Sequence, residues 1–434
     1  MSQPDRMVCE DIVMALRSGT VPAVGLEHIA VGLDAEIQAI EELFEYAAAG
    51  RSAYKFIRGA YGAGKTFLST LAGSRALDQG FLSSSVVISR VDTSLYKLDQ
   101  VYRKLCLELC SRSHPRGALQ SVLDRWLYSL EDRVIEFDGL SEHDPGFIDA
   151  VGRKVEQVLQ PLGEKAGRMV ACLRAYHKCQ MDEDYASSRA LLDWMSGDPK
   201  VSSSVTRVAG IRGALDSTDA LVFLRGLLEL IRATGHKGLV LVLDEVETVS
   251  TQPRPQRLKS LEVLRTLIDA LDKNEYPGLV LLITGTPDFF EGSQGVPELA
   301  PLHDRIRVDF SDERPDNLRM AQIRLRSFDA ARLLAVARKV KEIYPAKNPE
   351  RIARRVDEAL IQDMVKTFTE GFGGEVTVVP RLFLREFLQV MDLVDLHDYD
   401  PRRQYSFNAD RVAEGSLTPE EEQFLDQEAK ALFL

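Results

Sequence analysis

Residues 59–66, with the sequence GAYGAGKT, fit the pattern G-x-x-x-x-G-K-[ST] without a mismatch. Glycines in this pattern let successive backbone N–H groups point inward at one anion, as the β-phosphate of a nucleotide requires. Lys65 then reaches the β- and γ-phosphates, and the Thr66 hydroxyl ligates Mg²⁺. The pattern therefore predicts a P-loop, a site for a nucleotide and Mg²⁺. Its expected contacts are Gly59, Ala60, Tyr61, Gly62, Ala63, Gly64, Lys65, Thr66 and Phe67.

An apolar run over residues 239–243 ends in two carboxylates, Asp244 and Glu245. Beside a P-loop, Asp244 would hold the Mg²⁺ shell directly or through water, and Glu245 would orient and deprotonate the attacking water. The alternative is a pair of ordinary acids at a strand end. Because a P-loop precedes them, we expect the catalytic pair, with Glu247 as the next candidate base.

A second apolar run, over residues 279–283, ends in the hydroxyl side chains Thr284 and Thr286. A hydroxyl at this place can contact the γ-phosphate or the attacking water, and spacing alone does not choose between the two threonines. A plain structural hydrogen bond is the alternative for either of them. We place Thr284 in the catalytic set and keep Thr286 as its competitor.

The elements that would position these side chains follow from hydrophobic periodicity. Strands are expected at residues 53–58, 86–91, 238–243 and 279–283, and a fifth near 306–310; helices are expected at 9–17, 34–49 and 255–273. Strands that alternate with amphipathic helices predict an α/β fold with a parallel sheet.

Residues 98–216 are almost wholly helical in pattern, which is far more chain than a connection between two strands requires. We therefore expect a helical insertion there, within an ATPase core formed by residues 1–97 and 217–312. Amphipathic helices at 328–344, 348–370 and 380–394 then predict a helical lid, which with a C-terminal tail occupies residues 313–434.

The chain of 434 residues has a formal net charge of −12 and five cysteines. This charge argues against a nonspecific polyanion binder but allows a local basic patch. The odd, sparse cysteines indicate a reducing compartment. No apolar run is long enough to span a bilayer, and residues 1–20 lack a signal-peptide core, so we expect a cytoplasmic protein without a membrane role.

The densest basic stretch lies in the predicted lid. Its residues are Arg332, Arg338, Lys339, Lys341, Arg351, Arg354 and Arg355. Such a surface could bind the phosphate backbone of DNA with steep salt dependence. The alternative is a solvated helix face that balances neighbouring acids.

Taken together, these motifs resemble the AAA+ class of ATPases near its Orc/Cdc6 and STAND relatives. Two further features carry the resemblance: Val31-Gly32 before the helix at 34–49, and Pro380-Arg381 at the start of the last lid helix. More narrowly, the chain resembles the BREX-system ATP-binding proteins of bacterial phage-defence islands. The matching phrases are GAYGAGKTF (59–67), LDWMSG (192–197), GLVLVLDE (238–245), LRTLID (264–269) and GTPDFF (285–290).

The resemblance implies a Mg²⁺-dependent ATPase in which Val31 and Gly32 also contact the nucleotide. It places a sensor hydroxyl at Thr284 or Thr286, a trans-acting arginine finger at Arg305 and a second sensor at Arg381; either arginine could instead form a surface salt bridge. It further implies a helicase-like partner, action on double-stranded DNA directly or through that partner, and a nucleotide-dependent homo-oligomer. A nucleotide-dependent signalling scaffold and a replication or recombination loader are the alternative functions.

Overall fold

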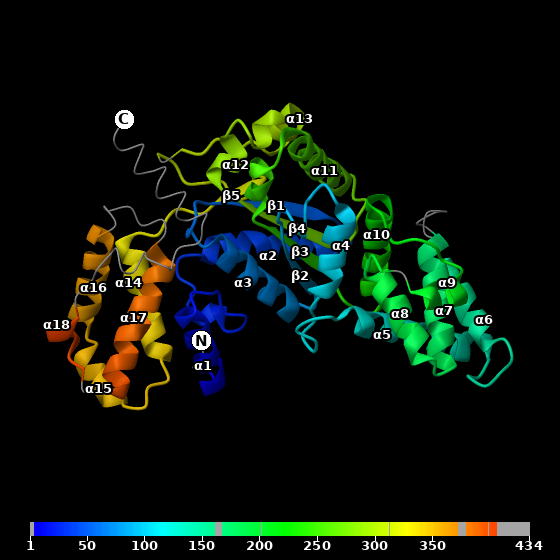
Figure 1. Cartoon of the computed structure of the whole chain (residues 1–434), viewed down its shortest axis with the longest axis horizontal. Coiled ribbons are helices and arrows are strands. Elements are labelled where there is room, and N and C mark those ends of the chain that lie inside the picture. The colour runs from blue at the N-terminus through cyan, green and yellow to red at the C-terminus, as the bar shows by residue number, and fades with distance from the viewer. Residues whose placement is uncertain are drawn as a thin grey trace. The chain divides into compact units, whose positions relative to one another are not determined.

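The computed structural model describes residues 4–160, 167–200, 202–311, 313–371, 379–397 and 399–405. The part of the predicted tail from residue 406 onward lies outside these ranges. Five strands form one sheet in the order β2-β3-β4-β1-β5 (Figure 1). Their bounds are β1 (Ala53–Arg58), β2 (Leu82–Val87), β3 (Leu239–Asp244), β4 (Leu279–Gly285) and β5 (Gln322–Arg324).

Apolar sequence explains the centre of this sheet. Every residue of β3 and of β4 is buried, as expected for strands covered by helices on both faces. β3 pairs in parallel with β2 on one side and with β4 on the other, with Leu239 opposite Leu82 and Leu279. The predicted α/β fold with a parallel sheet is confirmed.

Two strand predictions were wrong in position. β2 begins four residues before the predicted 86–91, because its Ser83 and Ser84 are buried among helices although their side chains are polar. Ser84 satisfies its hydroxyl by donating to the Leu105 carbonyl at 2.9 Å. The fifth strand is the short β5, whereas residue 306 ends a helix; three residues are too few to show a periodicity.

The structure divides into two compact units, one formed by residues 1–38, 57–71 and 323–434, and the other by residues 39–56 and 72–322. Helices α2 (Asp34–Ala48) and α3 (Lys65–Asp78) contribute residues to both. The second unit contains α4 (Leu98–Leu107), α5 (Leu119–Arg133), α6 (Phe147–Leu159), α7 (Gly167–Met181), α8 (Tyr185–Met195), α9 (Ser203–Ala209), α10 (Ser217–Ala233), α11 (Arg254–Asp272), α12 (Pro287–Glu291) and α13 (Ala300–Ile306).

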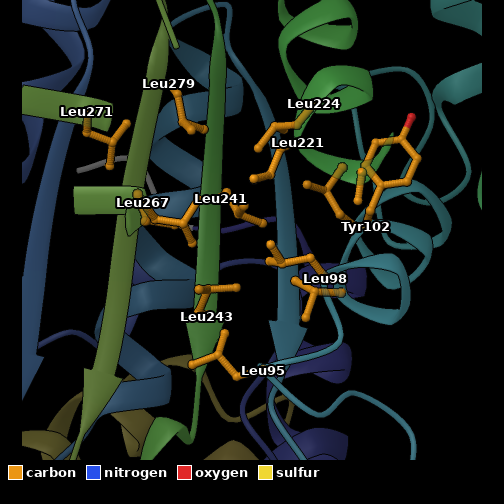
Figure 2. Close-up of a pocket in the computed structure, with 14 residues that line it drawn as sticks. Leu95, Leu98, Tyr102, Leu221, Leu224, Leu241, Leu243, Leu267, Leu271 and Leu279 are labelled. Carbon is orange, nitrogen blue, oxygen red and sulfur yellow. The ribbon is translucent and has the colours of Figure 1, made fainter. Parts of the chain in front are cut away.

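In this second unit, the strands and the helices of the predicted insertion share one continuous apolar core. Figure 2 shows leucines of β3 and β4 meeting side chains from α4 and α10, among them Leu98 and Leu224. A cavity of about 30 Å³ remains between them, with room for about one water molecule. Since its lining is aliphatic apart from Tyr102, we expect it to be dry.

The first unit has its own core, formed by α1 (Arg6–Arg17) together with α14 (Ala330–Ile343), α15 (Pro349–Arg355), α16 (Glu358–Gly371) and α17 (Val379–Leu396). α18 (Pro401–Gln404) follows α17. α1 packs along α17 (Figure 1). Arg17 fixes this contact with two hydrogen bonds to the Asp392 carboxylate, at 2.7 and 2.6 Å. Tyr344 donates a third, at 2.6 Å.

The predicted single helix at 348–370 is in fact two helices. α15 ends at Arg355, and α16 starts at Glu358. Between them, the Asp357 carboxylate accepts a hydrogen bond from the Leu360 N–H at 2.9 Å, in the manner of an N-cap. The sequence hides this break because the apolar periodicity runs on through Val356, which is fully buried.

None of the helices in the described ranges combines the length and the apolar character that crossing a membrane demands.

Gly238 and Gly278, at the starts of β3 and β4, approach too closely for a side chain. A Cβ at Gly238 would lie 2.0 Å from the Gly278 carbonyl oxygen. We predict that Gly238→Ala lowers the free energy of unfolding by about 2–3 kcal/mol, as overpacking does. Gly235→Ala is the control, because Gly235 also has positive φ but nothing within 4 Å; it should cost about 1 kcal/mol. Chemical denaturation compares the two, and equal losses would contradict the steric reading.

Candidate functional site

The P-loop connects β1 to α3 in the first unit. Gly62 and Gly64 have φ values of 73° and 95°, which side chains rarely adopt. A Cβ at Gly59 would lie 3.2 Å from the Leu325 Cβ. Glycines are therefore needed here for both reasons that the motif suggests, tight turns and close packing. Leu325 itself is anchored beside the loop, since its N–H donates to the Arg58 carbonyl at 2.7 Å.

Lys65 is folded onto its own loop. Its ammonium donates to the carbonyls of Gly59 and Ala60 at 3.0 and 3.2 Å and lies 5.1 Å from the centre of the Tyr61 ring. The side chain is buried, whereas Thr66 in the first turn of α3 is exposed. The ammonium, the hydroxyl and the N-terminus of α3 together make this loop suited to an anion.

Residues flanking the P-loop pack against the core of the first unit. Val31 and Phe67 are half-buried against it, and so is Phe328. Gly32 has a φ of 64°, and a Cβ there would lie 3.7 Å from Arg332. The structure thus places the predicted Val31 and Gly32 in the same compact unit as the P-loop. Phe328 and Leu325 were not expected near the P-loop, because the short β5 that brings them there has no signal in the sequence.

Arg381, the predicted second sensor, is half-buried in the first turn of α17. The carbon chain of its side chain lies against Gly19, where a Cβ would be 3.4 Å away. Arg385, one turn further along α17, borders the same glycine. Arg381 therefore belongs to the same compact unit as the P-loop.

The acidic pair forms a hydrogen-bonded corner at the end of β3, in the second unit. Asp244 is the last residue of the strand and is almost fully buried. The Thr284 hydroxyl at the end of β4 donates to its carboxylate. The Glu245 N–H donates both to the Asp244 Oδ1 and to the Thr284 Oγ1, each at 3.1 Å. We call these three residues the acidic corner.

Glu245 has a left-handed backbone, with φ 59° and ψ 40°. For a residue other than glycine this conformation costs about 1–2 kcal/mol, and such residues concentrate at functional sites. This turn comes just before the short helix η5 (Val246–Thr251), which contains the buried Glu247.

The two threonine candidates occupy different places. Thr284 is fully buried in the acidic corner. Thr286 is the N-cap of α12 and makes no side-chain capping hydrogen bond. Of the two threonines, Thr284 is the one whose hydroxyl donates to the Asp244 carboxylate.

Arg305, the predicted arginine finger, lies in the last turn of α13. Its guanidinium forms ion pairs with Asp269 and, at 3.2 Å, with Asp272, both on α11. The side chain is 40% exposed, so the ion pairs are open to solvent and weak enough to exchange.

At least four of the seven basic residues predicted for DNA bond to other groups of the same chain. Arg351 donates to the carbonyls of Asp395 and His397 at 3.1 and 3.0 Å, which satisfies the C-terminal end of α17. Arg355 donates to the Tyr399 carbonyl, and Arg338 pairs with Glu358. Lys339 donates to the Ala30 carbonyl. These bonds explain much of the basic charge as structural.

A glycine-rich loop after one strand of a parallel sheet, with an acidic pair after another, is typical of the P-loop class of nucleotide-binding proteins. The chain belongs to the family of BREX system ATP-binding proteins BrxC/D, whose family model matches residues 5–409. This membership confirms the resemblance seen in the sequence, and with it ATP binding.

No curated protein matches the chain. Among solved structures, it is similar to the Aeropyrum pernix ORC2 protein in its ADPNP-ADP complexes. The identity is 12% and the TM-score 0.42, over 89% of this chain and 67% of that one.

The acidic corner makes a prediction about stability. Thr284→Val removes the donor to a buried carboxylate, so the free energy of unfolding should fall by about 1–3 kcal/mol. Thr286→Val is the matched control and should cost about 0.5 kcal/mol or less, because that hydroxyl makes no capping bond. Chemical denaturation of both variants tests this; a Thr286→Val loss as large as that of Thr284→Val would contradict the hydrogen bonding described for the corner.

Proposed function

We propose that the chain binds ATP with Mg²⁺ and hydrolyses it within a phage-defence system of the BREX type. The hydrolysis would use the P-loop and the acidic corner on the same nucleotide. The observation that carries this proposal is the left-handed Glu245, whose N–H is held by Asp244 and Thr284 at the end of β3. The strand order β3-β4-β1 supports it, because the P-loop follows β1 in the same sheet.

In this proposal the Lys65 ammonium exchanges the carbonyls of Gly59 and Ala60 for phosphate oxygens, which bind a cation more strongly. Thr66 and Asp244 offer the hydroxyl and carboxylate oxygens that Mg²⁺ prefers. The bound metal would neutralise charge on the phosphates. Glu245 would take the proton of the attacking water, and Thr284 would keep the Asp244 carboxylate in place.

The two arginines would meet the charge that develops on the transferred phosphoryl group. Arg381 would act from α17 of its own subunit. Arg305 would act on the nucleotide of a neighbouring subunit, after leaving Asp269 and Asp272. This role requires a homo-oligomer in the active state.

The ATP cycle would serve a step on foreign DNA. We favour action through a helicase-like partner over direct contact with the lid, because Arg338, Arg351 and Arg355 already bond to groups of the same chain. A signalling scaffold that turns over ATP slowly is the second candidate function. Steady-state turnover with and without DNA and partner separates the two.

Two substitutions should separate binding from hydrolysis. Lys65→Ala should lose nucleotide binding, because it removes the ammonium that neutralises the β- and γ-phosphates. Glu245→Gln should keep binding but lower turnover by roughly 10²–10⁴, because the amide does not accept the proton. Titration with a labelled ATP analogue and a phosphate-release assay measure the two properties.

Glu247→Gln is the control for Glu245→Gln, since Glu247 lies two residues further along and is buried in η5. It should leave turnover within about threefold of the wild type. Normal turnover in Glu245→Gln would contradict the assignment of Glu245 as the general base. A large loss of turnover in Glu247→Gln instead would identify Glu247 as the base.

Arg305 allows a prediction about assembly. If it acts in trans, turnover per subunit should rise with protein concentration, and Arg305→Ala should remove that rise while ATP binding persists. Arg307→Ala is the control, because Arg307 is an exposed neighbour that pairs with Asp309, two residues along the chain. Concentration-independent turnover in the wild type, or an equal effect of both variants, would leave the trans role without support.

A further inference from the structure

Two adjoining hollows lie beside the first turns of α5, on the second unit. One has a volume of about 290 Å³ and is lined by Arg112, Ser113 and His236 among others. The other has a volume of about 500 Å³. Ser121 and Arg125 line both hollows, so they form the wall between them.

The smaller hollow is positively charged. In the described part of the chain, Arg125 makes no ion pair, and Arg112 reaches only Asp78 at 3.8 Å, where both side chains are mostly exposed. Burial, and next the charge of Arg125, lower the pKa of His236. Two guanidinium groups therefore face a space in which no carboxylate of the lining residues balances them.

The loop that carries Arg112 and Ser113 is closed by its own hydrogen bonds. The Ser111 N–H donates to the His114 carbonyl at 2.8 Å, and the His114 N–H donates back to the Ser111 carbonyl at 3.2 Å. His114 also bonds through Nδ1 to the Ser113 hydroxyl at 3.0 Å. The loop holds its polar groups in place before any ligand arrives, which lowers the entropic cost of binding.

The larger hollow has a different chemistry. Its lining includes an aromatic face, Tyr128, which is 65% exposed, and the polar Gln120. It also contains Asp124, whose carboxylate accepts a hydrogen bond from the Tyr176 hydroxyl at 2.6 Å and is thereby fixed in position. A negative charge held here repels a phosphate and suits the donor groups of a base.

One face of α5 carries side chains that line both hollows. Ser121, Arg125 and Tyr128 stand at positions i, i+4 and i+7, which lie on the same side of a helix. The rise over seven residues is about 10 Å, comparable with the span from the phosphate to the far edge of the base in one nucleotide. The hydroxyl, the cation and the aromatic ring follow one another along this distance.

We propose that the double hollow binds a nucleotide unit, with its phosphate beside Arg112 and Arg125 and its base against Tyr128. The unit comes either from a free mononucleotide or from a single-stranded nucleic acid. Arg125 fixes the phosphate between the hollows, and Tyr128 stacks on the base. This site is separate in sequence from the P-loop and does not depend on ATP hydrolysis.

The test uses the full chain with Lys65→Ala in the background, so that the P-loop does not compete. The probe is a fluorescein-labelled single-stranded hexathymidylate, followed by anisotropy at low salt. Arg125→Ala should weaken binding by about tenfold or more. Arg116→Ala is the matched control and should stay within about twofold. It removes an exposed cation from the same loop region, paired with Glu108 at 3.5 Å, that lines neither hollow.

Tyr128→Ala distinguishes the contribution of base stacking from the contribution of phosphate binding. It should weaken the oligonucleotide by about tenfold, a loss that removal of one stacking contact explains, while leaving competition by inorganic phosphate unchanged. Both Arg125 and Tyr128 are exposed on a helix, so alanine, a good helix former, should leave thermal unfolding unaltered.

If AMP competes as strongly as unlabelled hexathymidylate, the ligand of the double hollow is a free mononucleotide. If AMP competes more weakly, the ligand is a single-stranded nucleic acid. Failure of the Lys65→Ala chain to bind either probe overturns the proposal. Equal losses in Arg125→Ala and Arg116→Ala also overturn it, because the attraction is then diffuse. The P-loop assignment survives either failure, since it rests on ATP titration of the chain with Lys65 intact.

Discussion

The Glu245 N–H at the end of β3 is held by two acceptors, and the left-handed turn that places Glu245 depends on them. Asp244 Oδ1 and Thr284 Oγ1 each accept from it at 3.1 Å. A non-glycine residue keeps such a backbone only where the surroundings enforce it. Here the enforcement comes from two neighbouring strands whose ends are buried and whose polar groups bond to one another. Strained positions of this kind concentrate at functional sites, which is why the proposed catalytic role is assigned to Glu245.

The rest of the sheet makes this corner possible. β3 and β4 are apolar on both faces, and their polar groups appear only where the strands end. The close approach of Gly238 and Gly278 sets the strands at their opposite ends. In the P-loop, hydrogen bonds within the loop play the corresponding part, because Lys65 donates to the Gly59 and Ala60 carbonyls.

The sequence predicted correctly the strands that are continuous apolar runs. It failed where the position of an element, or the partner of a side chain, depends on a tertiary contact. β3 and β4 are solid apolar runs, so their positions followed from composition. β2 was misplaced because its Ser83 and Ser84 are buried although polar, and Ser84 finds its partner in α4, the next helix of the chain. The ion pairs of Arg305 with α11 and the use of Arg351 to satisfy α17 are equally invisible to spacing. Sequence motifs indicate which side chains could take part in the chemistry. Only the tertiary structure shows which of these side chains already form ion pairs or hydrogen bonds within the chain.

The central claim is that the P-loop and the acidic corner act on one nucleotide, and hydrogen exchange tests it most directly. Exchange is followed by mass spectrometry with Mg²⁺ and increasing concentrations of a non-hydrolysable ATP analogue. We predict that amides in residues 59–66 and in residues 244–250 become protected together, with the same half-saturating concentration, and that Lys65→Ala removes both effects. Protection confined to residues 59–66 at saturating analogue would contradict the claim.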